Sequence, residues 1–198
     1  MADEVTASNE GGSFAPHPAG QFPARCVDVL NMGEKVEQYQ DNPKKMVKKC
    51  ALVFVTGEKR DDGTPDTVSA EFTISMGERA NLRIFLENWR GKSYTDEEAD
   101  AGVPIHKLEG QPALLTVEHK RSGKGRNYAK IKTVAALPKQ MLDAAPTSEG
   151  YKRAEWWETR KKEYAAAAKL FKEAENKLGG GYPEALDADD DEDSSLPF

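Results

Sequence analysis

Apolar and polar residues alternate in a way that predicts three strands in the first third of the chain. Residues 22–30 (FPARCVDVL) predict the first strand, and a polar stretch follows at 31–45. Residues 46–58 (MVKKCALVFVTGE) form a long β-rich run, and residues 69–76 (SAEFTISM) alternate as a half-buried strand does. Because the residues between these last two strands, KRDDGTPD, are dense in turn formers, we expect an antiparallel meander.

The spacing of apolar residues then changes, which predicts a helix over residues 77–91. Its apolar side chains recur at intervals of three and four and would share one helical face; they are Leu82, Phe85, Leu86 and Trp89. Gly91 stands where a helix C-cap belongs. Residues 95–102 predict a second, short helical turn that begins with a Thr cap and ends at Gly102.

Two more strands are expected after these helices, at residues 111–120 (QPALLTVEHK) and 127–137 (NYAKIKTVAAL), joined by the basic loop RSGKGR. The order of elements over residues 22–138 is therefore β-β-β-α-β-β. This order predicts a mainly β fold, a five-stranded OB-fold barrel. In such a barrel, the outer strands and loops bind single-stranded nucleic acid or oligosaccharides.

Residues 150–178 predict an added C-terminal α-helix, with an aromatic and apolar stripe that recurs every seven residues at Trp157, Tyr164, Phe171 and Leu178. The opposite side is basic and carries Arg160, Lys161, Lys162, Lys169 and Lys172. Our first interpretation is that the stripe docks on the barrel or on another copy of the chain, giving a homo-oligomer. The second is that this basic helix adds to a DNA-binding surface.

The composition divides the chain of 198 residues into one domain and its appendages. We expect a disordered arm at 1–21, the OB-fold domain at 22–138, a linker with the amphipathic helix at 139–178, and a flexible acidic tail at 179–198. The domain contains 19 basic and 17 acidic residues, whereas the tail contains seven acidic residues and no basic one. This asymmetry points to nucleic acid or to a basic partner.

Cysteine and histidine usage argues against a metal site or cofactor. Cys26 and Cys50 form no CxxC pair, and the three histidines are scattered, so no zinc site can be assembled from spacing. Both cysteines are expected to be buried thiols in a reducing compartment. The longest apolar run, Cys50 to Val55, is far too short to span a membrane, and the N-terminus does not read as a signal peptide. We therefore expect a cytoplasmic protein.

An enzyme is not expected, because no set of residues has the spacing of a catalytic site. Asp61 and Asp62 precede Gly63, where acidic residues usually form a turn, and a catalytic role is the less favoured interpretation. The sequence GKG at 123–125 lacks the spacing of a phosphate-binding loop. No Ser/His/Asp or Cys/His set can be identified.

The last strand of the barrel is the first candidate for binding single-stranded DNA. Four of its residues have the same parity and should share one face: Arg126, Tyr128, Lys130 and Lys132. Ala129, Ile131 and Thr133 would then face the core. Cations follow phosphates, and a tyrosine ring offers a stacking platform worth ~1–3 kcal/mol per base. The adjoining loop adds Lys120, Arg121 and Lys124. The alternative is an ordinary solvated strand face.

A second basic cluster opens the second strand, with Tyr39 nearby, and consists of Lys44, Lys45, Lys48 and Lys49. In an OB barrel, the loops between strands 1 and 2 and between strands 4 and 5 both bind the ligand. We therefore expect the two basic clusters to converge on one groove. The alternative is a lysine-rich edge that discourages aggregation between sheets.

The C-terminal tip, DDDEDSSLPF at 189–198, resembles the acidic tip of the bacterial and phage single-stranded-DNA-binding proteins. Together with the OB-like order, this resemblance implies a non-catalytic protein that coats single-stranded DNA. It also implies that the tip recruits replication, recombination or repair proteins through Asp189, Asp190, Asp191, Leu196, Pro197 and Phe198. That family usually has a disordered linker where this chain has the helix at 150–178, which favours a phage-encoded version acting in the host cytoplasm.

The tip also has a physical rationale. A terminal aromatic ring can enter an apolar pocket while the α-carboxylate meets a cation, and the preceding acids steer it towards a basic rim. The alternative function is a protein–protein adaptor or histone-like chaperone, in which the acidic tail shields a basic partner and single-stranded DNA is not bound.

Overall fold

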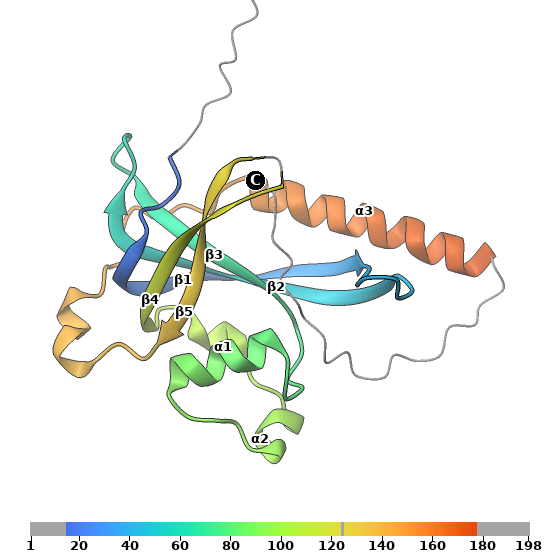
Figure 1. Ribbon diagram of the computed structural model, residues 1–198, viewed down its shortest axis with the longest axis horizontal. Helices are drawn as coiled ribbons and strands as arrows, with labels where there is room; N and C mark the ends of the chain where they lie inside the picture. Colours follow the sequence, from blue (N-terminus) through green and yellow to red (C-terminus); the bar gives the residue numbers. More distant parts are fainter. Residues whose placement is uncertain (1–14, 124, 178–198) are drawn as a thin grey trace, which may run out of the picture.

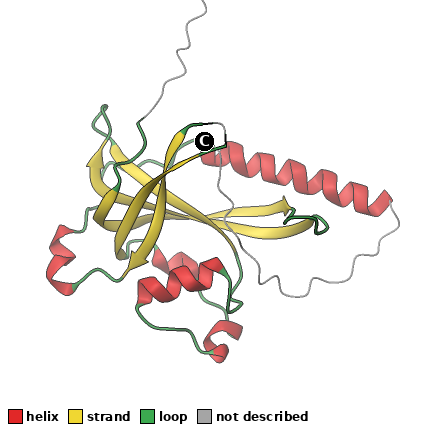
Figure 2. Ribbon diagram, in the orientation of Figure 1, coloured by secondary structure: helices red, strands yellow, loops and turns green. Residues whose placement is uncertain are grey.

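The computed structural model describes residues 15–123 and 125–177, which form a curled antiparallel sheet with helices on both of its faces (Figure 1 and Figure 2). The strands are β1 (Gly20–Glu37), β2 (Lys45–Lys59), β3 (Pro65–Thr73), β4 (Pro112–Arg121) and β5 (Asn127–Ala135). The helices are α1 (Asn81–Arg90), α2 (Asp96–Asp100) and α3 (Trp156–Lys177). Short 3-10 helices occur at Ile105–Leu108 and Lys139–Ala144.

The five strands lie in the order β3-β2-β1-β4-β5, and each neighbouring pair is antiparallel. The sheet curls, so that Cα atoms of its two edge strands, β3 and β5, come within 8 Å of each other. No ladder joins these two edges within the described residues, and the sheet is open. The predicted mainly β fold, with five strands, a helix between the third and the fourth, and a C-terminal helix, is confirmed at this level.

The first hairpin is longer than predicted, because β1 continues through the polar stretch to Glu37. Register shifts occur between Cys26 and Asp28 and between Asn31 and Gly33. Gly33 has a φ of 77°, a conformation that glycine adopts at little cost. The far part of this hairpin is a two-stranded ribbon of mainly polar residues. Its β1 half lacks the alternation that identifies a half-buried strand, so sequence patterning missed it, whereas its β2 half falls within the strand predicted at 46–58.

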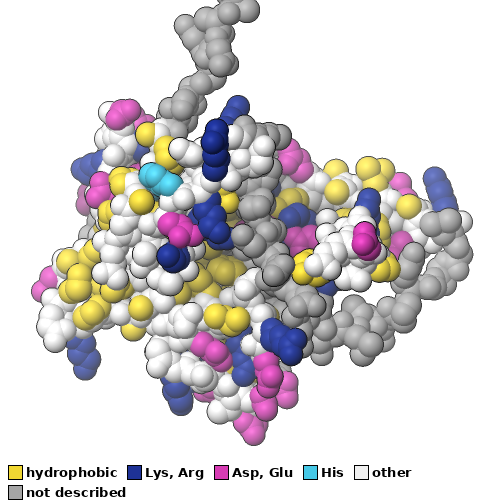
Figure 3. Space-filling view, viewed as in Figure 1, with side chains coloured by type: hydrophobic (Ala, Val, Ile, Leu, Met, Phe, Trp, Pro, Cys, Tyr) yellow, Lys and Arg dark blue, Asp and Glu magenta, His cyan; other side chains and the backbone are white. Residues whose placement is uncertain are grey.

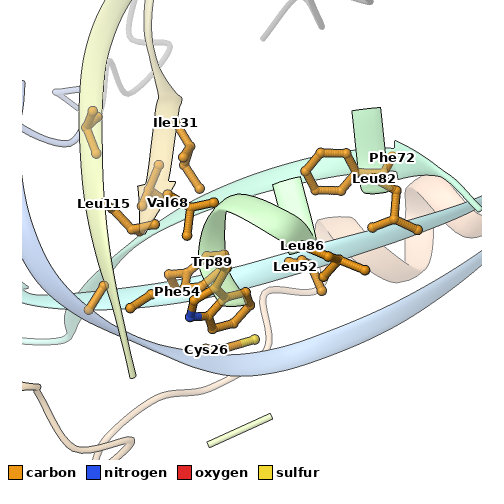
Figure 4. Packing of buried hydrophobic residues seen from close by; sticks show 14 of the residues in the cluster. Cys26, Leu52, Phe54, Val68, Phe72, Leu82, Leu86, Trp89, Leu115 and Ile131 are labelled. Carbon is orange, nitrogen blue, oxygen red and sulfur yellow. The ribbon is translucent and has the colours of Figure 1, made fainter. Parts of the chain in front are cut away.

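The larger core packs α1 against the inside of the curled sheet (Figure 4). Leu82, Leu86 and Trp89 are each at most 6% exposed, and Phe85 packs beside them. The Trp89 indole N–H donates to the carbonyl oxygen of Pro112 at 2.9 Å. The predicted apolar face of this helix is therefore confirmed, and so is its C-cap: Gly91 has a φ of 70° and donates to the Glu87 carbonyl oxygen.

A second core lies on the other face of β1 and β2, where α3 and the segment before it pack (Figure 1). Side chains alternate along β2 between the two cores. Leu52 and Phe54 belong to the first core, and Val53 and Val55 belong to the second. Burial on both faces explains why this strand reads as a continuous apolar run rather than an alternating one.

The aromatic stripe of α3 packs against the sheet of its own chain. Trp157 and Tyr164 are 4% and 8% exposed in the second core, and Phe171 is half-buried. Leu178, the last member of the predicted stripe, lies outside the described residues. Trp156 cannot share the stripe with its neighbour; it is 41% exposed and stacks on Trp157 with ring centroids 3.9 Å apart. Docking on the sheet, one of the two forms of our first interpretation, is thus observed.

One carboxylate of β1 holds the segment that leads into α3. Asp28 accepts hydrogen bonds from the Tyr151 hydroxyl at 2.9 Å and from Arg153 Nε at 2.7 Å. Its side chain is 7% exposed, so this charge is buried and is neutralised by a guanidinium. Burial, and then the hydrogen bond to Asp28, raise the pKa of Tyr151. We call these three residues the Asp28 clamp.

A carboxylate of β3 holds α3 itself in the same way. Glu71 accepts hydrogen bonds from the Tyr164 hydroxyl at 2.7 Å and from Arg160 Nε at 3.1 Å. The side chains of Glu71 and Arg160 are 5% and 13% exposed. The pKa of Tyr164 is raised, first by burial and then by its hydrogen bond to Glu71. We call these three residues the Glu71 clamp.

The packed part of the chain begins within residues 1–21, which sequence composition predicts to be a disordered arm. β1 begins at Gly20, and His17 is 3% exposed. An imidazole nitrogen of His17 lies 2.6 Å from Thr56 Oγ1, and its ring meets the Phe22 ring edge to face at 4.9 Å. A single histidine among Gly and Pro residues has no periodicity, so its burial leaves no signal in the sequence.

Candidate nucleic-acid interface

The β4–β5 hairpin places cations and a tyrosine on one face of the sheet. Lys120 of β4 is the cross-strand partner of Tyr128 in β5, and Glu118 is the partner of Lys130. Directly opposed residues share a face, and so do residues two positions apart on one strand. These four residues therefore form one surface, which Lys132 joins; we call the five of them the hairpin patch.

An acidic residue that sequence parity did not predict sits within the hairpin patch. Glu118 lies 3.8 Å from Lys120 Nζ and 3.6 Å from Lys132 Nζ. These two lysine side chains are 39% and 60% exposed, so both ammonium groups stay in contact with solvent. Glu118 belongs to the neighbouring strand, and the parity of β5 alone carries no sign of it. Figure 3 shows Lys and Arg side chains gathered over the upper part of this face, with an acidic side chain among them.

A bulge in β5 changes which of its residues face the core. The predicted alternation holds as far as Ile131, which is buried on the face opposite Tyr128. The ladder then shifts between Thr116 and Val117, and Lys132 becomes the extra residue. As a consequence Thr133 is exposed and Val134 is 4% exposed, so our prediction that Thr133 faces the core is wrong.

The loop between β4 and β5 is closed by its own hydrogen bonds. Ser122 donates its N–H to the Arg126 carbonyl oxygen at 2.8 Å, and its hydroxyl accepts from the Arg126 N–H at 3.1 Å. Arg121 and Arg126 are at the two ends of this loop, where Arg126 is exposed and the Arg121 guanidinium reaches the Gly125 carbonyl oxygen at 3.3 Å. Lys124 lies outside the described residues. The loop thus places two guanidinium groups at the end of the hairpin that carries the patch.

The second predicted cluster lies on the β1–β2 ribbon. Tyr39 and Lys44 are in its turn, and Lys45 and Lys48 are in β2. Lys44 and Lys48 are exposed, whereas Tyr39 and Lys45 are half-buried. We call these four residues the ribbon patch. Each of its lysines has solvent access, as contact with phosphate requires.

Lys49 does not belong with the other three lysines. Its side chain is 4% exposed, and its ammonium lies 2.8 Å from Glu37 Oε1 and 2.8 Å from Thr73 Oγ1. Glu37 also pairs with Lys35 at 2.8 Å. The Lys49 side chain is therefore part of the packing between strands. Its partners on β1 and β3 become apparent only when the strands are paired, and the run of lysines in the sequence hides the difference.

The two patches lie at separate corners of the sheet. In Figure 1 the tip of the β1–β2 ribbon and the tip of the β4–β5 hairpin point in different directions, with α3 extending above the ribbon. A bound strand that touches both patches must therefore cross the distance between them. Their convergence on one groove stays a prediction.

The acidic turn between β2 and β3 has the structural role that was expected of it. Asp62 Oδ1 accepts hydrogen bonds from the Thr64 N–H at 2.9 Å and from the Thr64 hydroxyl at 2.6 Å. These bonds lower the pKa of Asp62. Gly63 follows with a φ of 80°. The geometry is that of a side chain stabilising a tight turn.

Metal ligands do not cluster in the described part of the chain. Across residues 15–123 and 125–177, His, Cys, Asp and Glu do not gather in any group of three or more that could hold a metal ion. No helix in these ranges is both long enough and apolar enough to cross a membrane. Cys26 and Cys50 are buried free thiols, as expected. The predicted tip residues, from Asp189 to Phe198, lie outside the described residues.

Comparison with known proteins adds no family: the chain matches no protein-family model and no curated protein.

Proposed function

We propose that this chain is a non-catalytic single-stranded-DNA-binding protein whose curled sheet works as an OB-fold barrel. The support for an OB-like arrangement is the order of elements, the antiparallel pairing and the approach of β3 to β5. In OB-folds, the loops between strands 1 and 2 and between strands 4 and 5 bind the ligand. In this chain the ribbon patch lies at the β1–β2 connection and the start of β2, and the hairpin patch lies on β4 and β5 beside their connecting loop.

The observation that carries the proposal is the placement of Tyr128 in the hairpin patch. Its cross-strand partner is Lys120, and Lys130 follows two positions along the same strand. A base can stack on the ring while the lysines on either side neutralise the neighbouring phosphates. Glu118 lowers the net charge of this surface, so we expect binding that is moderate in strength and sensitive to salt.

The acidic tip supplies the second part of the proposed function. Its terminal Phe198 and the preceding Leu196 and Pro197 would dock on replication or recombination proteins, and its Asp residues would steer the encounter. The tail also carries seven acidic residues, so it should compete with DNA for the two basic patches. The support for this part is the sequence of the tip and its resemblance to the single-stranded-DNA-binding family.

The proposal is tested by titrating the full chain with oligo-dT at several salt concentrations. We expect affinity to fall as salt rises, because phosphate contacts release counterions. Tyr128→Ala should lose ~1–3 kcal/mol of binding free energy, the contribution of one stacked base. Tyr128→Phe is the matched control, since it keeps the ring and should keep the affinity. An affinity that does not respond to salt, or equal losses in the two variants, would contradict the proposal.

Two tail variants separate this function from that of an adaptor or chaperone. Deletion of residues 189–198 should tighten oligo-dT binding at low salt, because it removes five of the tail's seven competing acidic residues. Phe198→Ala keeps every charge and should abolish binding to a partner protein while leaving oligo-dT affinity unchanged. The alternative, a chaperone that works by charge, predicts no binding to oligo-dT. It also predicts that the unaltered chain and Phe198→Ala bind a basic partner with the same affinity.

A further inference from the structure

The sheet face beneath α3 is poorly suited to nucleic acid. The side chains that α3 covers there are mainly aliphatic, among them Val53 and Val55. The two groups that anchor the helix and its lead-in, Asp28 and Glu71, are carboxylates that would repel phosphates if they were uncovered. We therefore regard α3 as a fixed part of the folded domain. A strand that binds this protein has to run past the helix and not beneath it.

The exposed flank of α3 is rich in lysine. With 3.6 residues per turn, four lysines fall within about 100° of the helix circumference; they are Lys161, Lys162, Lys169 and Lys172. The flank begins beside the buried stripe of Trp157 and Tyr164, and Lys172 reaches β1, where its Nζ contacts Glu34 Oε2 at 2.7 Å. Two carboxylates of the helix pair with this flank: Glu158 lies 3.5 Å from Lys161 Nζ, and Glu173 lies 4.0 Å from Lys169 Nζ. We call these four residues the lysine flank.

Glu34 links the lysine flank to the ribbon patch. On the β1–β2 ladder it is the cross-strand partner of Lys48, a member of that patch. Its pKa is lowered, first by the hydrogen bond and charge of Lys172 and then by the charge of Lys48. Lysines from two elements that are far apart in sequence thus converge on a single carboxylate.

A groove runs along this junction. It has a volume of about 320 Å³, and Ala165 and Ala168 are among the residues that line it. Lys169, Lys172 and Glu173 line it from the helix, with Lys169 Nζ 4.0 Å from Glu173 Oε1, and Glu34 lines it from β1. The side chains of Lys169 and Lys172 are 78% and 51% exposed, so an anion in the groove could reach both ammonium groups. The small alanine side chains leave room for a backbone to approach.

We propose that the lysine flank and the ribbon patch form one continuous path for the phosphates of a single strand, along the junction between α3 and the β1–β2 ribbon. Glu34 holds Lys172 in position in the free protein and is displaced from it by a phosphate. This inference rests on the proposed function, and it adds a surface that lies outside the five-stranded sheet. It predicts that neutralising the lysines lowers the affinity for a single strand and that neutralising the carboxylate between them raises it.

The test compares three variants of the full chain in oligo-dT titrations over a range of salt. Lys169→Gln/Lys172→Gln should weaken binding and reduce the slope of log affinity against log salt by about 1.4, because each phosphate of a single strand that is no longer neutralised reduces it by about 0.7. Glu34→Gln should raise the affinity at low salt. Lys92→Gln/Lys107→Gln is the matched control, since it removes two exposed lysines from the α1 side of the molecule and should leave the slope unchanged.

The outcomes separate this inference from the proposed function. If the unaltered chain and the control variant bind with a normal salt dependence, and Lys169→Gln/Lys172→Gln keeps the same slope, the path along α3 is wrong and single-strand binding stands. A Glu34→Gln variant that binds more weakly would also overturn the path. If the unaltered chain does not bind oligo-dT at all, the proposed function itself fails. Thermal denaturation of each variant checks that α3 remains folded.

Discussion

Removing the guanidinium from the Glu71 clamp should weaken the attachment of α3 to the sheet. In Arg160→Met the Glu71 carboxylate, whose side chain is 5% exposed, loses its cation and keeps the hydrogen bond from Tyr164. Breaking a buried ion pair by removing one partner costs about 3–5 kcal/mol. Because the Tyr164 hydroxyl remains 2.7 Å away, we expect a value near the lower end, about 3 kcal/mol.

The destabilisation of Arg160→Met cannot exceed the free energy with which α3 docks on the sheet. If α3 leaves the sheet, Glu71 regains water and the penalty disappears, but Trp157 and Tyr164 become exposed. Burial of a large apolar side chain contributes about 1.5–3 kcal/mol, so the two together contribute roughly 3–6 kcal/mol. The penalty and the docking energy are comparable. Arg160→Met should therefore populate a form in which the sheet is folded and α3 is detached.

Urea denaturation followed by tryptophan fluorescence measures both effects, because Trp156 and Trp157 lie at the start of α3. We expect the urea midpoint of Arg160→Met to fall. We also expect tryptophan emission to shift to the red at urea concentrations below the main transition. Glu71→Gln/Arg160→Met should recover about 1 kcal/mol relative to the single variant, because a neutral amide is cheaper to bury than an unpaired charge. A loss below about 0.5 kcal/mol in Arg160→Met, the level of an ordinary surface change, would refute the reasoning. So would a double variant that is no more stable than the single one.

Buried tyrosines, cysteines and a buried lysine can be tested in the same protein. The pKa values of Tyr151 and Tyr164 are raised, first by burial, so their contribution to stability is complete below the ordinary tyrosine value of about 10 and is lost as pH rises above it; a denaturation midpoint that stays constant across that pH would contradict this. Burial raises the pKa of Cys26 and Cys50 to about 12, so a thiol reagent at neutral pH should label neither in the native protein and both in urea. Lys49→Gln should lower the free energy of unfolding and leave the salt slope of oligo-dT binding unchanged, because that amine is buried in an ion pair; a reduced slope would place it on the DNA.

The elements that sequence patterning predicted well are those with one buried face. The helix over α1 was identified because its apolar residues recur at helical spacing and a glycine follows its last turn. The alternation in β3 and β4 is visible because one side of each strand faces the core. The end of β1 was missed because its mainly polar residues show no period, whereas the β2 residues that pair with it lie within the strand predicted at 46–58.

The candidate site was predictable in outline and not in detail. Sequence parity located Tyr128 and Lys130 on one face, but a bulge two residues later changed the orientation of Thr133. A run of four lysines looked uniform, yet Lys49 is buried against Glu37 and Lys48 is exposed. Such differences depend on which residue of another strand lies opposite. Neighbours along the chain contain no information about that pairing.

The burial of β2 on both faces has a consequence for the order in which the protein folds. The strand is complete at residue 59, whereas the helix that covers its second face begins at residue 156. At about 5–20 residues per second, the ribosome takes on the order of 10 s to make the residues between them. During that time the aliphatic side chains of the second core are uncovered on the nascent chain. A fragment that stops at residue 138 would keep that surface exposed permanently and should aggregate.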